Sequence, residues 1–359
     1  MRIAKILLII VVIVCAYLLL WPVPVTPLAW QAPPDAGFVK DYARNFDLMP
    51  LEYIDIKDDF GPEDLAIDSK GTIVVSLHSG ALMKMEKGGS ALMSWVNTTG
   101  RPLGIEFDSR DNLIVADAYL GLLSVSPQGD ITLLSNMAQG IPISYADDLD
   151  ISEDGKIYFS DASTKFAAKT NYGTLTASLL DILEHGGHGR LLMYDPSTKL
   201  TSTLLTGLNF ANGVAVSHDQ RSILFNETGH YRVMRYWLDG DKRGQTETVL
   251  DNLPGFPDNL ARSPSEGYWL GLASPRSKAL DILSDRPFLR KVVQRLPAFM
   301  RPKAQEYGHV IKFSESGQVL QSLQDPSGDY PLSTGVLETA EYLYISSLNA
   351  DKLARKALN

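Results

Sequence analysis

The stretch GPEDLAID (61–68), followed at once by SKGTIVVSL (69–77), contains the pattern that decides the fold. A turn precedes a short apolar strand, a Gly-containing turn follows, and a second strand rich in β-branched residues comes next. Apolar runs bounded by turn residues in this way are typical of a β-hairpin. The same order of turn, strand, turn and strand returns along the chain. The six units begin GPEDLAID (61–68), RPLGIEFD (101–108), YADDLDIS (145–152), FANGVAVS (210–217), FPDNLARS (256–263) and STGVLETA (333–340).

The spacing of these units indicates the architecture. Three of the intervals match a four-stranded propeller blade of roughly 40–50 residues, and the two longer ones contain insertions at about 163–188 and 274–308. A β-sandwich, the rival all-β fold, would not explain one frame recurring in every unit. We therefore predict an all-β, six-bladed β-propeller with an N-terminal transmembrane helix and a short helical insertion in blade 5. The predicted segments are a membrane anchor (1–22), a linker (23–50) and the propeller (51–359), with a helical cap insertion at about 275–305.

Composition narrows the classes of function. The 359 residues carry a net charge of −9 and are 45% apolar and 21% charged, which is ordinary for a globular protein. An acidic chain without an extended basic patch is a poor candidate for binding nucleic acid. Cys15 is the only cysteine, so the propeller has no disulfide. The sequence contains neither the G-x-S-x-G motif of serine hydrolases nor a phosphate-binding P-loop.

The N-terminus differs from the rest of the chain. Arg2 and Lys5 precede an apolar run from Ile6 to Trp21, which Pro22 ends. This run and its apolar neighbours amount to about 20 residues, enough to span a hydrocarbon core. The alternative is a cleaved secretory signal, but bulky residues before the proline leave no small-x-small cleavage site. The positive charges predict a cytoplasmic N-terminus and a propeller on the exported side, in a periplasm, lumen or extracellular space.

Two triplets match the glycosylation pattern N-x-T, which matters in a host that glycosylates. Asn97 and Asn226 begin them, and such triplets accept glycans in exported proteins.

The repeat also predicts a site. Equivalent positions in a propeller face the same end of the central channel. Aligning the units brings six residues into register: Glu63, Leu103, Asp147, Asn212, Asp258 and Gly335. Four of them bear oxygen, and the following residue is polar in three units, as Asp64, Asp148 and Asn259. Asp and Asn are also common turn residues before strands. However, converging acids repel one another without a cation, and carboxylate and amide oxygens suit Ca²⁺ or Mg²⁺.

In its repeated motifs the sequence resembles the strictosidine-synthase-like propellers. The motifs GPEDLAID, RPLGIEFD, DDLDIS, FANGVAVS and PGFPDNLAR carry the resemblance, which covers roughly residues 55–358. The same superfamily includes paraoxonases, gluconolactonase and regucalcin, and diisopropyl fluorophosphatase. The resemblance implies a catalytic calcium at the channel. The ligands that it implies are Glu63, Asp147, Asn212, Asp258 and Asn259. It also implies a second, structural calcium at Asp64 and Asp148, and it makes Asp258 the candidate catalytic carboxylate.

The sequence departs from the superfamily's patterns at two positions. Paraoxonases have a histidine, implicated as general base, where this chain has Leu103. Strictosidine synthase uses a glutamate in its sixth unit, where this chain has Thr334, with Glu338 four residues later. The resemblance therefore does not imply amine–aldehyde condensation here. Glu227 is a weaker acid or base candidate, and its alternative interpretation is a solvated turn residue.

The insertions contain two further features. His185 and His188 lie in the first insertion and could bind a metal or act as a base, although a Gly-rich surface loop is the simpler interpretation. From Lys278 to Lys303 the second insertion interleaves apolar residues with cations. It can be a cap packed on the propeller or an interfacial segment that contacts lipid.

Together these features predict a membrane-anchored, Ca²⁺-dependent hydrolase of esters or lactones, similar to an arylesterase or lactonase. The expected substrate is a small, lipophilic ester or lactone. The alternative is a non-catalytic propeller that binds a ligand or partner and uses calcium for structure, because a fold alone does not decide function.

Overall fold

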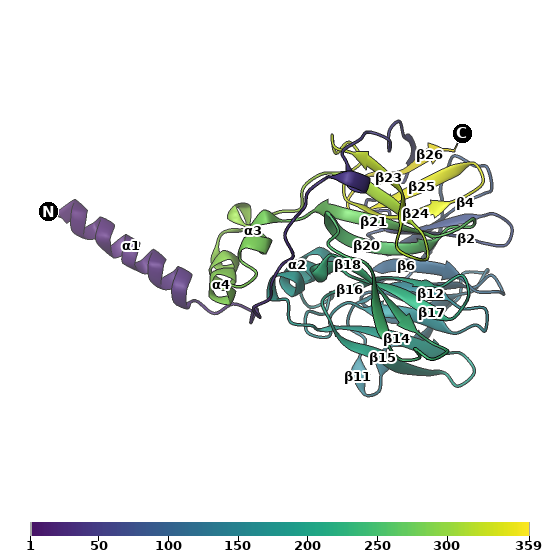
Figure 1. Ribbon diagram of the computed structural model, residues 1–359, viewed down its shortest axis with the longest axis horizontal. Helices are drawn as coiled ribbons and strands as arrows, with labels where there is room; N and C mark the ends of the chain where they lie inside the picture. Colours follow the sequence, from purple (N-terminus) through teal and green to yellow (C-terminus); the bar gives the residue numbers. More distant parts are fainter. Residues whose placement is uncertain (1, 359) are drawn as a thin grey trace.

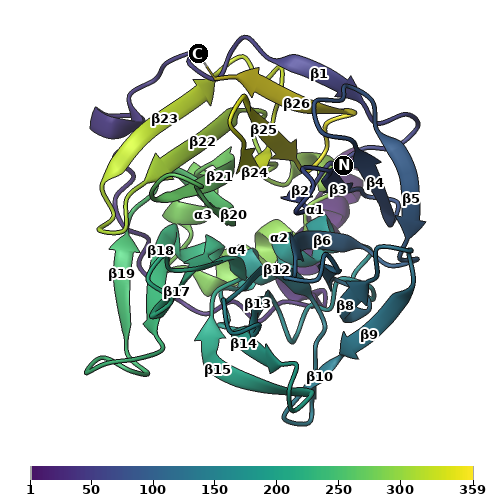
Figure 2. The same ribbon diagram turned by 90° about the vertical axis from the view of Figure 1, so that its right-hand side faces the viewer.

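The chain forms a ring of six four-stranded antiparallel sheets, seen along its axis in Figure 2. The computed structural model describes residues 2–358. Each sheet is one blade, whose strands are ordered from the central axis to the rim. The predicted six-bladed β-propeller is confirmed.

Blades 1 to 3 follow one another along the chain. Blade 1 comprises β2 (Asp64–Ile67), β3 (Ile73–Ser76), β4 (Ala81–Met85) and β5 (Met93–Asn97). Blade 2 comprises β6 (Pro102–Phe107), β7 (Leu113–Asp117), β8 (Gly121–Val125) and β9 (Ile131–Ser135). A small hairpin of β10 (Met137–Ala138) and β11 (Ile141–Pro142) comes next. Blade 3 comprises β12 (Ala146–Ile151), β13 (Ile157–Asp161), β14 (Gly189–Asp195) and β15 (Leu200–Leu208).

Blades 4 to 6 complete the ring. Blade 4 comprises β16 (Ala211–Val216), β17 (Ser222–Glu227), β18 (Arg232–Trp237) and β19 (Thr246–Leu250). Blade 5 comprises β20 (Gly255–Arg262), β21 (Tyr268–Pro275), β22 (Gly308–Phe313) and β23 (Val319–Asp325). Blade 6 comprises β24 (Ser333–Glu338), β25 (Tyr342–Ser347), β26 (Lys352–Ala357) and, at its rim, β1 (Glu52–Asp55).

The ring is closed by strands from opposite ends of the propeller sequence. β1 pairs antiparallel with β26, with Glu52 opposite Arg355. Arg355 Nε donates to Glu52 Oε2 at 2.9 Å. β1 is the outer strand of blade 6, so both ends of the propeller sequence belong to one sheet and the ring is closed. This radial closure protects the strand edges.

The hydrophobic core lies between neighbouring blades. In one buried cluster, Ala66 and Val74 of blade 1 pack against Ile105 and Val115 of blade 2. The second strands of the blades are buried on both faces, so their sequences are nearly continuous apolar runs, such as IVVS in β3 and LIVAD in β7.

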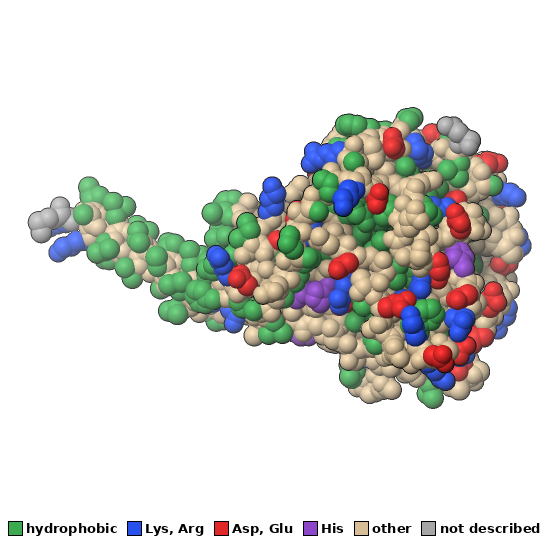
Figure 3. Space-filling model, in the orientation of Figure 1, with side chains coloured by type: hydrophobic (Ala, Val, Ile, Leu, Met, Phe, Trp, Pro, Cys, Tyr) green, Lys and Arg blue, Asp and Glu red, His purple; other side chains and the backbone are tan. Residues whose placement is uncertain are grey.

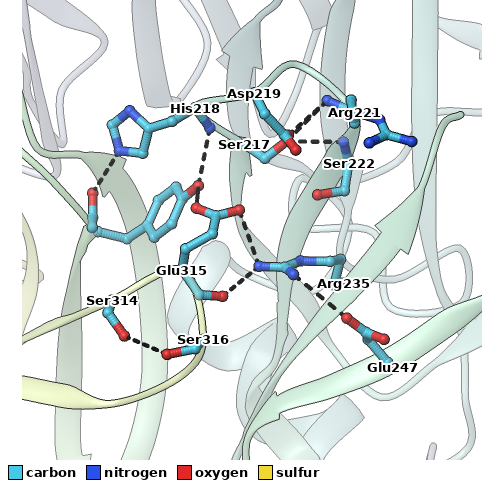
Figure 4. A network of polar contacts seen from close by, with 12 residues as sticks. Ser217, His218, Asp219, Arg221, Ser222, Arg235, Glu247, Ser314, Glu315 and Ser316 are labelled. Atoms are coloured by element: carbon cyan, nitrogen blue, oxygen red, sulfur yellow. Dashed lines mark hydrogen bonds and ion pairs between the residues drawn. The ribbon is translucent and has the colours of Figure 1, made fainter.

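Polar contacts add to the joint between blades 4 and 5 (Figure 4). Arg235 of β18 donates to the carboxylates of Glu247 in its own blade and Glu315 in the turn after β22. His218 Nε2 lies 3.0 Å from the carbonyl oxygen of Gly267. His218 therefore serves as a link between blades.

The helices α1 to α4 are all on the same side of the ring (Figure 1). The apolar helix α1 (Arg2–Leu20) projects away from that side. The second insertion forms α3 (Lys278–Ile282), α4 (Pro287–Arg295) and the 3₁₀ turn η3 (Ala298–Met300), which confirms the predicted helical insertion in blade 5. The first insertion also contains a helix, α2 (Thr174–Glu184), which was not predicted. We call α2, α3, α4 and η3 the cap.

Residues 23–50, expected to be a linker, run along the cap and the propeller as an ordered strap. Thr26 N donates to Glu184 Oε2 at 2.6 Å, and Leu28 N donates to the carbonyl oxygen of the same residue at 2.9 Å. Trp30 N donates to the carbonyl oxygen of Ser284 at 3.0 Å. The strap also contains the 3₁₀ turn η1 (Lys40–Tyr42); a third such turn, η2 (Thr228–His230), follows β17. The strap thus joins both insertions through main-chain hydrogen bonds.

Candidate functional site

The predicted site residues lie at or near the start of the inner strands. In five of these strands, the pairing with the second strand shifts register at the same point, at 102–105, 146–149, 211–214, 257–260 and 333–336. Such bulges re-aim side chains and are frequent beside functional sites. The register after each bulge makes Thr334, and not Gly335, the equivalent of Glu63 in blade 6. The predicted alignment, which placed Gly335 at this position, was therefore wrong by one residue in blade 6.

The residue after each of these positions alternates around the ring. Blades 1, 3 and 5 have Asp64, Asp148 and Asn259, whereas blades 2, 4 and 6 have glycine. A Cβ on Gly104 would lie 2.6 Å from the Cα of Asp148. Alternating glycines therefore leave the space that the three polar side chains occupy near the axis.

A cavity of about 490 Å³ lies between this end of the channel and the cap. Glu63, Asp147, Asn212 and Asp258 line its propeller side, so the structure brings four of the predicted site residues together. Apolar side chains form much of the remaining wall, including Leu103, Leu179, Leu183, Leu280, Leu283 and Val293. An apolar cavity with a few convergent polar groups is typical of a small-molecule site.

The carboxylates of this floor are buried close to one another. Burial raises the pKa of Asp147 well above its usual range, and the neighbouring carboxylates of Asp258 and Glu63 raise it further. Burial likewise raises the pKa of Asp258, with Glu63 as the second cause. The ionised forms are therefore unfavourable unless positive charge is added.

Two oxygens at the floor lack hydrogen-bond partners. Asn212 Nδ2 donates to Asp258 Oδ1 at 2.8 Å, which leaves Asn212 Oδ1 buried and unpaired within residues 2–358. Asp147 Oδ2 is in the same condition. No three Asp, Glu, His or Cys side chains among the described residues already form a metal site. In donor chemistry, three carboxylates and an amide oxygen nevertheless fit Ca²⁺.

Arg101 is a component of the floor that the sequence analysis missed. Its Nη2 donates to Glu63 Oε2 at 2.8 Å, and both side chains are almost fully buried. Burial raises the pKa of Glu63, and the Arg101 guanidinium opposes that rise. A signal was present in the sequence, because Arg101 opens the second unit, RPLGIEFD, two residues before the aligned position.

The second layer of polar residues binds backbone groups of neighbouring blades. Asp148 Oδ2 accepts hydrogen bonds from Val214 N at 2.8 Å and Leu260 N at 3.2 Å. Asp64 Oδ2 accepts a hydrogen bond from Ile105 N of β6 in blade 2, at 2.8 Å. Asn259 Nδ2 donates to the carbonyl oxygen of Glu63 at 3.0 Å, and its Oδ1 is buried without a partner within residues 2–358.

The histidines of the first insertion do not face each other. His188 Nε2 lies 2.7 Å from Glu184 Oε1, whereas His185 Nε2 lies 3.0 Å from His230 Nε2. Glu227 is buried and pairs with Arg232 Nε at 2.7 Å, so its interpretation as a solvated turn residue was wrong. None of these side chains lines the cavity.

The two positions that depart from the superfamily patterns are buried as well. Leu103 forms part of the cavity wall. Thr334 Oγ1 donates to the carbonyl oxygen of Glu63 at 2.7 Å. Glu338 lies at the other end of its strand and accepts a hydrogen bond from Trp269 Nε1 at 2.6 Å. Neither Thr334 nor Glu338 lines the cavity.

Comparison with known proteins shows which family the chain belongs to. The strictosidine synthase family matches residues 147–241, and the N-terminal part of strictosidine synthase-like proteins matches residues 41–85. The chain is 41% identical to Protein STRICTOSIDINE SYNTHASE-LIKE 13 of Arabidopsis thaliana over 64% of its own length and 57% of that protein. It therefore spans little more than half of this relative. It is 35% identical to the adipocyte plasma membrane-associated protein of Bos taurus over 94% of its own length and 85% of that protein.

Solved structures with the same fold are more distant in sequence. A gluconolactonase from Xanthomonas campestris has a TM-score of 0.63 at 14% identity and covers 93% of this chain and 98% of its own. A calcium-binding protein, regucalcin, from Agrobacterium tumefaciens has a TM-score of 0.58 at 13% identity and covers 85% of this chain and 93% of its own. At such identities the likeness concerns the fold. The chain belongs to the family of strictosidine synthase-like propellers that includes the adipocyte plasma membrane-associated proteins.

Proposed function

We propose that this protein is a membrane-anchored, calcium-dependent hydrolase of esters or lactones. The observation that carries the proposal is the floor of the cavity, where oxygen-bearing side chains from four blades meet beneath an apolar cover. Asp147 Oδ2 and Asn212 Oδ1, which are buried without partners there, are the atoms that a cation would bind first.

Glu63, Asp147, Asn212 and Asp258 would hold the calcium ion, with Asn259 Oδ1 as a further oxygen donor below them. When bound, calcium would polarise the carbonyl group of an ester or lactone. This would lower the free energy of the transition state by several kcal/mol. Asp64 and Asp148 are the candidates for a second, structural ion.

Asp258 is the candidate reacting carboxylate, either as the base that takes a proton from water or as the nucleophile. The Asn212 amide holds one of its oxygens at 2.8 Å. Burial raises the pKa of Asp258 in the metal-free protein, and a positive charge beside it would lower that pKa again. The side chain would then be ionised at neutral pH, as either role requires.

The cap determines what reaches Asp258. Leucines of α2 and α3 cover the floor, so a substrate with an apolar body buries surface when it enters. Apolar burial contributes about 25 cal/mol per Å². This supports a lipophilic ester or lactone.

The anchor assignment is part of the same proposal. Helix α1 has a mean hydropathy of 3.1, no residue of its 18-residue span window is buried, and its 19 residues extend about 28 Å. Arg295, buried in α4, donates through Nη1 to the carbonyl oxygen of Leu18 at 3.0 Å and through Nε to that of Trp21 at 2.5 Å. Cleavage near Pro22 would remove these acceptors, which favours an anchor over a signal. Arg2 and Lys5 favour a cytoplasmic N-terminus.

A hydrolysis assay with phenyl acetate and a panel of small lactones tests the proposal. We expect turnover with Ca²⁺, loss of turnover with EDTA, and a loss of at least about 100-fold in Asp258→Ala, the scale of removing a general base. Asp154→Asn, which changes an exposed carboxylate on the opposite face, is the matched control and should behave as wild type. Equal turnover in wild type and Asp258→Ala would refute the catalytic role.

A specific observation supports a second candidate, a non-catalytic ligand-binding propeller with structural calcium. Arg101 already neutralises part of the charge of Glu63, and Leu103 stands where paraoxonases have a histidine. Under this alternative, calcium raises the thermal stability and a ligand binds in the cavity, but no ester or lactone is turned over. Condensation of the strictosidine synthase type is not proposed, because Thr334 replaces the glutamate and Glu338 lies outside the cavity.

A further inference from the structure

The cap presents apolar side chains to its surroundings. Figure 3 shows them between α1 and the body of the propeller. Phe299 is 78% exposed and Ile282 is 65% exposed. Six such residues from all four cap elements are Leu175, Leu179, Ile282, Phe288, Phe299 and Met300.

Helix α4 has an inverted pattern for a surface that faces water. Its buried residues are Arg290 and Arg295, whereas Phe288 and Leu289 are exposed. A helix on a water-facing surface buries its apolar stripe and exposes its charges. The buried guanidinium groups make hydrogen bonds to the main chain. Arg290 Nη1 donates to the carbonyl oxygen of Leu183 at 2.9 Å, and Arg295 Nη1 donates to that of Leu18 at the end of α1. The outward surfaces of Phe288 and Leu289 are not covered by any of the described residues.

The same face is continuous with the helix that we propose as the membrane anchor. Arg295 binds the carbonyl oxygens of Leu18 and Trp21, so α1 ends against α4. Figure 1 shows α1 leaving the molecule on the side of the cap. A bilayer that contains α1 would therefore lie directly against the cap.

The charges around the apolar face fit a lipid surface. Lys278, Arg286 and Lys303 are exposed around it. The acid Asp285 lies 3.5 Å from Arg286 Nε. Apolar side chains with a rim of cations are typical of segments that insert at the level of the lipid head groups.

We propose that the cap face is a second membrane contact, seated in the head-group region of the bilayer that contains α1. Leu175 and Leu179 belong both to this exposed face and to the wall of the cavity. The cavity therefore opens toward lipid, and the substrates that reach it are molecules dissolved in the membrane. The membrane contact rests on the anchor assignment of the proposed function but not on catalysis, whereas the entry of substrates from the bilayer also rests on the proposed hydrolysis.

Site-directed fluorescence on the full-length protein tests the contact. Cys15→Ser provides a background without cysteine, and an environment-sensitive label is placed through Phe299→Cys, Ile282→Cys, Val11→Cys or Arg110→Cys. Arg110 lies in the turn between β6 and β7, at the far end of the inner strand from the site, and its side chain is 79% exposed. The protein is reconstituted in phosphatidylcholine–phosphatidylserine vesicles with or without spin-labelled lipid.

We expect blue-shifted emission and quenching by the spin-labelled lipid at positions 11, 282 and 299, and neither effect at position 110. Quenching at position 11 without quenching at 282 and 299 overturns the cap contact and leaves the anchor intact. An unquenched label at position 11 overturns the anchor and the cap contact together.

A variant separates this contact from the hydrolase proposal. Phe288→Asp with Phe299→Asp places charge on the cap face at residues that do not line the cavity. We expect a higher KM for a long-chain ester delivered in vesicles and an unchanged KM for phenyl acetate in water. An equal change for both substrates would overturn entry from the bilayer, whereas absence of any turnover in the wild type concerns the hydrolase proposal alone.

Discussion

Arg101 and Glu63 form an ion pair 2.8 Å apart at the floor of the cavity, and both side chains are almost fully buried. With Asp147 and Asp258, the floor contains three carboxylates and one guanidinium, so two negative charges remain when all are ionised. A divalent cation would balance this charge. Arg101 thus acts as a fixed part of the site's positive charge, and it gives Glu63 a cationic partner at 2.8 Å.

Arg101→Met should destabilise the metal-free protein by about 3–5 kcal/mol, because Glu63 is left buried without a partner. Calcium should recover more stability in this variant than in the wild type, since the freed carboxylate can then bind it. Urea unfolding with Ca²⁺ and with EDTA measures both effects. The double variant Arg101→Met with Glu63→Gln is the control and should lose the extra calcium response. An equal calcium response in Arg101→Met and wild type would contradict this role of Arg101.

Among the strands, the bulges and the alternating glycines decide where the site residues point. Gly104 and Gly335 occupy equivalent positions in blades 2 and 6 but differ in their surroundings. A Cβ would lie 2.6 Å from the main-chain Cα of Asp148 at Gly104, and 3.2 Å from the Cβ of Asn259 at Gly335. Gly104→Ala should therefore cost about 1–3 kcal/mol or more of stability, and Gly335→Ala less. Thermal unfolding of both variants tests the order, and a larger cost at Gly335 would contradict the proposed packing.

The repeat made the ring and most of the site predictable, because each blade repeats one hairpin with the same turn. Glu63, Asp147, Asn212 and Asp258 were found from this frame and do line one cavity. In blade 6 the predicted frame was one residue late, at Gly335, because Thr334 is neither an acid nor an amide like the residues that defined the frame. Arg101 and the strap were missed for a different reason: their partners are distant in sequence. Thr26, for example, bonds to Glu184, and no local pattern specifies such a contact.

The strap should respond to acid. Its Trp30 stacks on His185 with ring centroids 4.0 Å apart, and its Phe38 and Tyr42 pack against His309. Burial lowers the pKa of His309 to about 3, and burial with His230 lowers the pKa of His185 to about 3. The ordinary histidine pKa is about 6.5, so the unfolded chain binds more protons between these values. The stability that depends on these two neutral histidines is therefore complete above about pH 6.5, and it decreases as the pH falls toward 3.

His309→Leu keeps an apolar side chain beneath Phe38 and removes one of these titrating groups. We expect the loss of melting temperature between about pH 6.5 and 4 to be smaller in this variant than in the wild type. Scanning calorimetry across that range measures it. Identical slopes would show that His309 does not contribute to the acid response.

For the molecule as a whole, the proposed anchor predicts that the propeller lies on the exported side of a membrane, and one triplet can test this prediction. Asn97 is exposed at the end of β5, whereas Asn226 is fully buried with its amide bonded to the main chain of Asp258. The folded protein can therefore carry a glycan at Asn97, whereas a glycan at Asn226 would not fit into the fold. With a cytoplasmic N-terminus, the full chain made in microsomes should carry one glycan that a glycosidase removes. Thr99→Ala should abolish it and Thr99→Ser should retain it, because the hydroxyl of the third residue is what the acceptor triplet requires. A wild-type chain that inserts without a glycan would place the propeller on the cytoplasmic side, where the cap would face the other leaflet.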